Sequence, residues 1–378
     1  MLPPLSLYLH FPWCLRKCPY CDFNSQNLPE AADQRAYVAA LLADLAWEAD
    51  WVEGREMQTI FIGGGTPSLL SGALVATLLE GVAQRVALAS GAEITLEANP
   101  GAAEAGRFRA YRQAGVNRLS IGVQSFADEP LRALGRVHDR ASALRAVALA
   151  RRAGFDNLNL DLMFGLPRQT LGQALADVRT AIELGPEHIS YYQLTLEPGT
   201  AFYHQPPTLP MDEMVEEIEL EGQAALRAAG YGHYEVSAFA RPGRQCRHNL
   251  NYWQFGDYLG IGAGAHGKLS RGGEIRRRWR VRGGEAFMQQ AGGPAVLAGE
   301  QALEEVDLVA EFMLNALRLR EGFAEGLFEE RTGLPLARIE DRLAEAVQAG
   351  LLEWGNGHIA PSEQGRRFLN DLIEGFLP

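Results

Sequence analysis

Three of the four cysteines in this 378-residue chain fall within eight residues of one another, at Cys14, Cys18 and Cys21. Thiolates with the spacing C-x3-C-x2-C, on a loop that follows a strand-like segment, can converge on one metal centre. A structural zinc site normally has four protein ligands, and an ordinary [4Fe–4S] cluster also uses four cysteines. The spacing therefore raises the question of whether a fourth ligand completes the site.

The residues alone leave three kinds of site open. Cys246 or His10 could supply the fourth ligand of a tetrahedral zinc site. Three thiolates could instead bind three irons of a [4Fe–4S] cluster and leave the fourth iron open to a small molecule. The cysteines could also be buried or redox-active without a metal. A disulfide scaffold is not expected, because four cysteines are too few for one in a chain of this length.

Polar residues recur where strand-like segments end. The segment "QTIFI" is followed by the glycine-rich residues 63–67, and later strands carry Glu97, Gln124 and Asp161. In β/α barrels the functional face lies at the carboxyl ends of the strands, and glycines there let the backbone approach a ligand closely. Each residue alone is more often a helix cap, a turn or half of a salt bridge, but together with the cysteine loop they predict a binding site.

The elements that would position these residues alternate along the first half of the chain. Strand-like segments lie at 5–11, 57–64, 92–100, 117–126, 157–167 and 188–196, and helix-like segments lie at 33–52, 71–89, 102–114, 139–153 and 171–184. Such alternation predicts a parallel sheet with right-handed crossovers. Periodicity does not decide between a partial β/α barrel and a doubly wound sheet.

The pattern changes after residue 200. A proline-rich stretch at 204–210 precedes a helix near 211–229, and "YGHYEVSAFA" reads as a strand. From about residue 303 the chain is largely helical, with a hairpin around Gly355–Gly357 and a closing helix, which suggests a winged-helix-like module. We expect a core domain at 1–235, a connecting region at 236–300 and a C-terminal domain at 301–378.

Composition and charge narrow the class of protein. The hydrophobic content of 47% and charged content of 22% are typical of globular proteins, and the net charge of −12 argues against a broad nucleic-acid surface. The basic stretch "RRRWRVR" at 276–282 is expected to be a solvated strand or loop. The sequence has no apolar run of about 20 residues, and its first fifteen residues contain no Lys or Arg. We therefore expect a cytoplasmic protein.

The cysteine motif, with Tyr20 before its last cysteine, resembles the signature of the radical SAM superfamily. In that superfamily the open iron of a [4Fe–4S] cluster binds the amino and carboxylate groups of S-adenosylmethionine. The motifs "LYLHFPWC", "GGGTPS", "GVQSF" and "DLMFGLP" occur in the same order as in the oxygen-independent coproporphyrinogen III oxidase family. This resemblance, which extends over nearly the whole chain, implies an α/β fold: a radical SAM partial (β/α)6 barrel followed by a smaller, mostly helical, winged-helix-like C-terminal domain.

The resemblance also implies a set of cofactor-binding residues. The cluster would be bound by the three clustered cysteines. The S-adenosylmethionine pocket would be formed by Tyr8, Tyr20, Gly64, Gly65, Thr66, Glu97, Gln124, Arg136 and Asp161. Within it, the Glu97 carboxylate suits ribose hydroxyls because it accepts from two donors, and the planar guanidinium of Arg136 suits the cofactor's carboxylate.

Two features separate this chain from the decarboxylating oxidase. That enzyme carries a further cysteine two residues after the third, where this chain has Phe23. In addition, "RHNLNYW" at 247–253 resembles the heme-binding motif of the heme chaperone branch of the family. Its candidate heme contacts are His248, Asn249, Tyr252 and Trp253, with His10, His233 and His266 as alternative iron ligands. Without the resemblance, the same aromatic side chains would be interpreted as packing under the barrel mouth.

The resemblance thus implies a heme chaperone that binds heme and a [4Fe–4S] cluster with S-adenosylmethionine and transfers heme to an acceptor haemoprotein. The alternatives are an oxygen-independent coproporphyrinogen III oxidase and a zinc-stabilised binding protein. Whether S-adenosylmethionine is cleaved, and so whether the chain is an enzyme, is left open. The acceptor, a peripheral membrane association and a homodimer are likewise not decided by the sequence.

Overall fold

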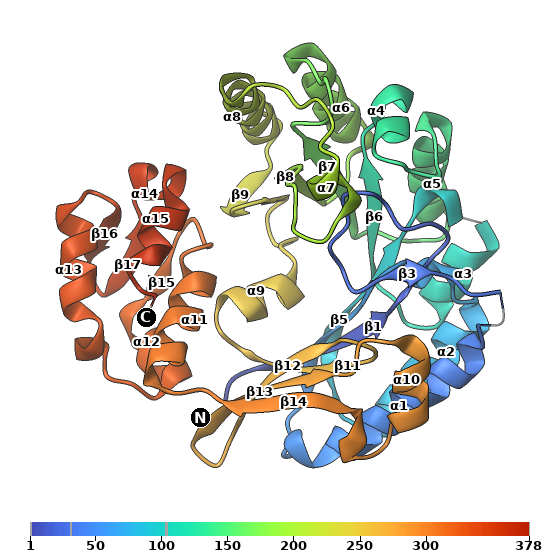
Figure 1. Cartoon of the computed structure of the whole chain (residues 1–378), viewed down its shortest axis with the longest axis horizontal. Helices are drawn as coiled ribbons and strands as arrows, with labels where there is room; N and C mark the ends of the chain where they lie inside the picture. The colour runs from blue at the N-terminus through green and yellow to red at the C-terminus, as the bar shows by residue number, and fades with distance from the viewer. Residues whose placement is uncertain (1, 31, 103–104, 378) are drawn as a thin grey trace.

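The computed structural model describes all residues except 1, 31, 103–104 and 378, and its main feature is one curved, twelve-stranded sheet (Figure 1). Six parallel strands stand side by side in chain order. They are β1 (Leu5–Phe11), β4 (Met57–Gly64), β5 (Leu88–Ala98), β6 (Arg118–Gln124), β7 (Leu158–Phe164) and β8 (His188–Gln193). The sheet is open rather than closed, because other strands extend it at both ends. This arrangement confirms the predicted partial (β/α)6 barrel.

Helices connect these strands along the outside of the curved sheet. They are α1 (Gln34–Glu48), α2 (Gly72–Ala83), α3 (Ala105–Gln113), α5 (Arg140–Arg152) and α6 (Leu171–Leu184), with a short additional α4 (Asp128–Ala133). Their ends follow from local chemistry: the Thr170 hydroxyl and Gln173 form a capping box at the start of α6, and Gly185 ends that helix in the left-handed conformation. Strands buried on both faces account for the nearly continuous apolar runs of β1 and β7.

Residues 232–302, which include the region 236–300 expected to connect the two domains, extend the sheet at both of its edges. The single strand expected at "YGHYEVSAFA" is wrong: the segment forms a hairpin of β9 (Gly232–Glu235) and β10 (Ala238–Ala240) beside β8, because a turn interrupts it. At the opposite edge, β11 (Asp257–Ile261) pairs in parallel with β1. Further elements complete this region: α9 (Arg247–Trp253), β12 (His266–Arg271), β13 (Glu274–Arg280), α10 (Gly284–Gln290) and β14 (Leu297–Ala302).

The basic stretch at 276–282 is only partly solvated. It lies mostly in β13, where alternate side chains face opposite sides of the sheet. Arg278 and Arg280 are buried against α1, and Arg280 donates to Glu48 at 2.6 Å and to Asp44 at 3.2 Å. Arg278 also pairs with Glu48. The expectation of a solvated segment is therefore wrong for these two arginines, because acidic residues on a distant helix compensate their charge.

The C-terminal part has its own small core. It contains α11 (Glu305–Ala316), α12 (Glu325–Thr332), α13 (Glu340–Gln348), α14 (Glu363–Arg367) and α15 (Leu369–Glu374) around a sheet of β15 (Phe323–Ala324), β17 (His358–Pro361) and β16 (Leu352–Gly355). Phe255, which follows α9, is packed into this core with Phe312. Helix α9 contacts both β4 and α11, so it links the barrel to the C-terminal part (Figure 1).

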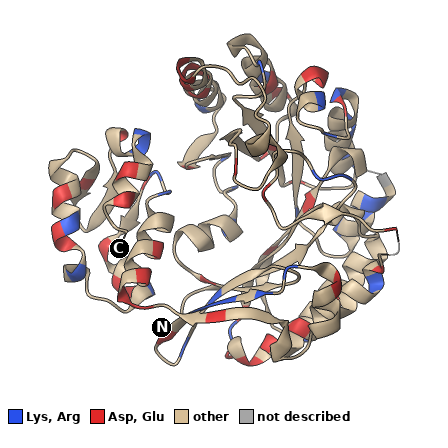
Figure 2. Cartoon of the chain, viewed as in Figure 1, with Lys and Arg blue, Asp and Glu red and all other residues tan. Residues whose placement is uncertain are grey.

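Two helices between β8 and β9 complete the chain, namely α7 (Ala201–His204) and α8 (Asp212–Ala228). Acidic residues recur along α8 and on the C-terminal helices (Figure 2). Within the described residues, no helix is both long enough and apolar enough to cross a membrane.

Candidate functional site

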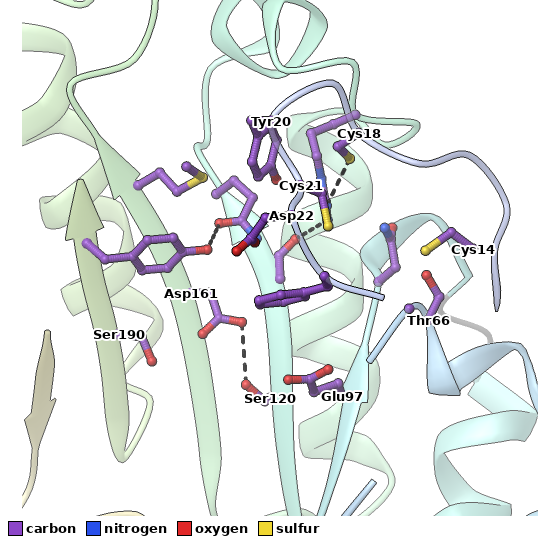
Figure 3. Close-up of a pocket in the computed structure, with 18 of the residues that line it drawn as sticks. Cys14, Cys18, Tyr20, Cys21, Asp22, Thr66, Glu97, Ser120, Asp161 and Ser190 are labelled. Carbon is purple, nitrogen blue, oxygen red and sulfur yellow. Dashed lines mark hydrogen bonds between the residues drawn. The ribbon is translucent and has the colours of Figure 1, made fainter. Parts of the chain in front are cut away.

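A cavity of about 500 Å³ opens where the parallel strands end, and it collects most of the predicted site residues. Those that line it are Cys14, Cys18, Tyr20, Cys21, Gly64, Gly65, Thr66, Glu97, Gln124, Arg136 and Asp161. Figure 3 shows the cysteine side chains at one end of this cavity and Glu97 and Asp161 at the other. We call it the cysteine cavity.

Backbone hydrogen bonds hold the cysteine loop in shape. Residues Trp13–Cys14 form β2, which pairs in parallel with β3 (Gln26–Asn27) and brings the two ends of the loop together. The backbone N–H of Lys17 donates to the Asn27 side chain at 2.8 Å. Burial raises the pKa of the Cys14 and Cys21 thiols. Three thiols thus face one cavity from a short, pinned loop.

The two residues considered as a fourth zinc ligand lie elsewhere. Cys246 is fully buried and its thiol points to Glu93, with 3.7 Å between Sγ and Oε1. Both ring nitrogens of His10 are engaged, by the Tyr8 hydroxyl at 2.9 Å and the Asn24 carbonyl at 2.8 Å. In the part of the chain that the structure describes, no group of three or more His, Cys, Asp or Glu is placed to hold a single metal ion. Three thiolates that each bind a different iron do not need such close sulfurs.

Arg136 gives the cysteine cavity a positive group beside the sulfurs. One guanidinium nitrogen donates to the Gly122 carbonyl at 2.7 Å, and another lies 3.6 Å from the Cys18 sulfur. Its Nε is buried and has no hydrogen-bond partner among the described residues. A buried donor without a partner is costly. The cavity therefore fits an anionic ligand group, such as a carboxylate, at this point.

Two buried carboxyl groups face the other end of the cavity. Asp161 accepts from the Asn159 amide at 2.7 Å and from the Ser120 hydroxyl at 3.4 Å. Glu97 accepts from the backbone N–H of Gly64 at 3.1 Å. Burial, reinforced by the nearby Asp161, raises the pKa of Glu97 to about 8, and burial also raises the pKa of Asp161. Both groups are thus poised to respond to a ligand that donates hydrogen bonds or carries positive charge.

The backbone around these carboxyl groups is unusually constrained. Gly64 has a φ of 112°, which L side chains rarely adopt. The next residue, Gly65, donates to the Phe11 carbonyl at 2.6 Å. Gln124, which is not a glycine, has a φ of 69° at the end of β6. Strained residues of this kind concentrate at binding sites, in agreement with the clustering of predicted residues here.

We expect Glu97 to make the stability of the protein depend on pH. Between pH 4.5 and about 8, folded Glu97 keeps a proton that the unfolded chain loses, so its contribution to stability is full below pH 4.5 and is lost as pH rises to about 8. The loss amounts to a few kcal/mol. The thermal unfolding midpoint of Glu97→Gln should therefore rise relative to that of wild type as the pH increases over this range. Asp161→Asn, which removes a neighbouring charge, should shrink the effect, whereas parallel pH profiles of wild type and Glu97→Gln would contradict it.

A second cavity of about 560 Å³ adjoins the first. The two share Asp22, Phe23, Gly64 and Glu97 as lining residues. Tyr8, Tyr252 and Trp253 line this second cavity, together with residues from β12, β13 and α11. Tyr8 was expected in the S-adenosylmethionine pocket, but in the structure its side chain lies on this neighbouring wall. We call this space the aromatic cavity.

His248 and Asn249 line neither of these two cavities. His248 is only 1% exposed and stacks on Phe61. Its Nδ1 pairs with the Thr59 hydroxyl at 2.7 Å and its Nε2 with the Tyr252 hydroxyl at 2.9 Å. Burial and the nearby Arg118 lower the pKa of His248 to about 3. In this structure His248 therefore positions the Tyr252 side chain through a hydrogen bond, and neither of its ring nitrogens is free to bind iron.

Sequence reasoning also missed residues that line the two cavities. In the cysteine cavity these include Ser120, Ser190 and Tyr192, whose hydroxyl donates to Gln124 at 2.8 Å. In the aromatic cavity they include Tyr258, Arg277 and Arg282. Strand-end position could have identified Tyr192. The others depend on pairings between segments that are distant in the sequence.

Comparison with known proteins agrees with this geometry. The profile of the Radical SAM superfamily matches residues 8–181, and that of the HemN C-terminal domain matches residues 303–368. The chain is 51% identical to the heme chaperone HemW of Escherichia coli (strain K12) over 377 residues, covering 100% of this chain and 99% of that protein. It is 46% identical to the heme chaperone HemW of Haemophilus influenzae, covering 100% of this chain and 98% of that protein.

Among solved structures, coproporphyrinogen III oxidase (HemN) from Escherichia coli superimposes with a TM-score of 0.83 at 25% sequence identity. The match covers 99% of this chain and 90% of that one. Both the barrel and the C-terminal part are therefore shared with that enzyme's chain.

Proposed function

Because this chain belongs to the heme chaperone HemW family of the radical SAM superfamily, we propose that it binds heme and passes it to an acceptor haemoprotein. The observation that carries the proposal is the similarity along the full chain, at 51% identity to a protein named as a heme chaperone. The absence of the oxidase's additional cysteine, where this chain has Phe23, supports the same conclusion.

The cysteine cavity is proposed to hold a [4Fe–4S] cluster and S-adenosylmethionine. When bound, the cluster supplies single electrons and one iron with an open coordination position. Cys14, Cys18 and Cys21 would hold it, and the unpaired Nε of Arg136 would receive the carboxylate of S-adenosylmethionine. Glu97 would accept from ribose hydroxyls, a role that favours its charged form.

The remaining predicted residues would shape this pocket. The backbone of Gly64, Gly65 and Thr66 would lie along the methionyl amino group. Gln124 and Asp161 would present oxygen atoms from the ends of β6 and β7. Tyr20 packs near Phe202, with 6.4 Å between ring centroids, and would screen the cluster from water.

Heme is proposed to enter the aromatic cavity. Tyr252 and Trp253 offer it flat apolar surface. His248 and Asn249 would act from behind this wall, His248 by its hydrogen bond to the Tyr252 hydroxyl. The shared lining residues would bring the heme next to the S-adenosylmethionine pocket. A cytoplasmic location, a peripheral membrane association and a homodimer are further parts of the proposal.

The alternative function is an oxygen-independent coproporphyrinogen III oxidase. The superposition on that enzyme, with a TM-score of 0.83, is the observation that favours it. Against it stands Phe23, on the wall shared by the two cavities, where the oxidase motif has a cysteine.

One preparation can decide between these functions. We expect the full chain, reconstituted anaerobically with iron and sulfide, to bind one heme per chain in a spectroscopic titration. With reductant, S-adenosylmethionine and coproporphyrinogen III, it should form no protoporphyrinogen. Formation of that product would overturn the chaperone assignment in favour of the oxidase. Failure to bind heme would also overturn it, and zinc at one per chain without iron would point to the zinc-stabilised alternative.

A further inference from the structure

The aromatic cavity combines three properties that suit a flat, apolar ligand with acidic groups at its edge. Its walls carry the aromatic side chains of Tyr252, Trp253 and Tyr258, and its volume of about 560 Å³ is within the usual range for cofactor pockets. Its lining also includes the basic residues Arg277 and Arg282. Porphyrins carry such a combination of a hydrophobic ring and propionate groups.

A histidine can bind heme iron only through a ring nitrogen that is not already engaged in a hydrogen bond. The chain has eight histidines, at positions 10, 138, 188, 204, 233, 248, 266 and 358. Among the described residues, six of them have at least one ring nitrogen engaged in a hydrogen bond. Only for His204 and His266 does the described structure provide no partner to either nitrogen.

Position in the fold separates these two histidines. His204 is exposed at the end of α7 and lines neither the cysteine nor the aromatic cavity. His266 lines the aromatic cavity and is exposed to it. His10 also lines this cavity, but both its nitrogens are occupied. His266 is therefore the one histidine in the described structure that faces the aromatic cavity with both nitrogens free.

Neighbouring residues hold the His266 ring in a defined place. His266 begins β12 and pairs with Trp279 of β13, and the two rings lie nearly parallel, 6.1 Å apart at an angle of 16°. The His266 backbone itself approaches β11 closely, since a Cβ added at Gly260 would lie 1.8 Å from the His266 carbonyl oxygen. A glycine is thus required opposite His266. The imidazole is placed by a rigid strand pair, which suits a ligand position.

Arg282 is the basic group that remains available. Arg277 is bound on both sides, because it donates to Glu311 at 2.9 Å and also contacts the Tyr258 hydroxyl. The Arg282 side chain is exposed and has no hydrogen-bond or ion-pair partner among the residues that the structure describes. Its guanidinium can pair with a carboxylate in a bidentate manner.

We propose that His266 binds the iron of heme in the aromatic cavity, while Arg282 pairs with a heme propionate. The bond forms when a lone pair of the neutral imidazole replaces water on the ferric iron, with no change in oxidation state. This inference rests on the proposed function, and it assigns the iron to a residue outside the "RHNLNYW" segment. His248 then acts only by positioning Tyr252.

The test is a titration of the full-length protein with ferric heme, followed by absorption and electron-spin resonance spectra. Even outer-shell partners of a metal ligand contribute about 10- to 100-fold to affinity, so His266→Ala should weaken binding at least about tenfold and change the spin state of the iron. His204→Ala is the matched control, because it removes the other histidine with two free nitrogens. It should leave the heme affinity and the spin state of the iron unchanged. Adding imidazole to His266→Ala should restore the ligand spectrum. Equal thermal midpoints for His266→Ala and wild type exclude misfolding as the cause.

The outcomes separate this inference from the function on which it rests. If wild type binds no heme, the proposed function fails. If wild type binds heme and His266→Ala gives the same affinity and spectrum, only the assignment of His266 fails. A folded His248→Ala that loses the iron ligand, with His266→Ala unaffected, would return that role to His248. Arg282→Ala should weaken heme binding without altering the iron spectrum, and an unchanged affinity would remove Arg282 from the propionate role.

Discussion

Replacing Cys18 with Ala is expected to abolish the iron–sulfur cluster. Among the residues that the structure describes, Cys14, Cys18 and Cys21 are the cysteines that line the cysteine cavity. The site therefore starts with one ligand fewer than an ordinary cubane, and loss of another leaves only two anchors. Iron and acid-labile sulfide, measured after anaerobic reconstitution, should fall to background. The electron-spin signal and its response to added S-adenosylmethionine should disappear with them.

Cys246→Ala is the matched control for this experiment. Cys246 is as buried as a core residue, and burial raises the pKa of its thiol to about 12, so it is an unreactive side chain. We expect the variant to lose some stability and to keep its full iron content. Equal loss of iron in Cys18→Ala and Cys246→Ala would contradict the three-thiolate assignment, as would full retention of the cluster in Cys18→Ala.

The cysteine cavity could be predicted well from the sequence because parallel strands bring their carboxyl ends together. Glu97, Gln124 and Asp161 are each separated by more than 25 residues from the next, yet they line the same space. Their strand assignments alone predicted that proximity. The cysteine loop follows the first of these strands, so its place at the same edge was implied as well.

The aromatic cavity could not be predicted in this way. It depends on β11, which pairs in parallel with β1 across some 250 residues of sequence. The sequence offers His266 only as one of three alternative iron ligands, and without that pairing it does not place Arg282 near Tyr252. The burial of His248 could not be read from the sequence either: the motif made it a candidate heme contact, but Thr59 and Tyr252 occupy its nitrogens. Partners of this kind come from other strands and helices, and periodicity does not report them.

The residue that departs from the oxidase motif, Phe23, lies where the two cavities meet. Phe23 lines both cavities and is 59% exposed. A cysteine at this position would present a further thiol to both spaces. An exposed phenylalanine instead offers apolar surface to a ligand in either of them. The substitution thus falls where it affects the proposed neighbours of S-adenosylmethionine and heme at once.

Gly64→Ala is expected to weaken S-adenosylmethionine binding by about a hundredfold, the size of effect that a displacement of about 1 Å has on a precisely positioned site. A Cβ at this position would lie 2.8 Å from the Phe11 carbonyl oxygen and 2.7 Å from the His10 ring. The backbone carbonyl belongs to the central strand β1 and cannot give way cheaply. The loop must therefore shift. It carries the Gly64 N–H that donates a hydrogen bond to Glu97, so this contact shifts with it.

Gly54→Ala separates this clash from simple backbone strain. Gly54 also has a positive φ, 72°, but a Cβ added there meets nothing within 4 Å. Both variants place an alanine at a positive φ that glycine tolerates better. Only Gly64→Ala must also relieve a steric overlap, which costs about 1–3 kcal/mol more. Equilibrium dialysis of reconstituted protein should show normal S-adenosylmethionine binding in Gly54→Ala and greatly reduced binding in Gly64→Ala. Equal affinities in the two variants would mean that the glycine segment at the end of β4 does not contact the ligand.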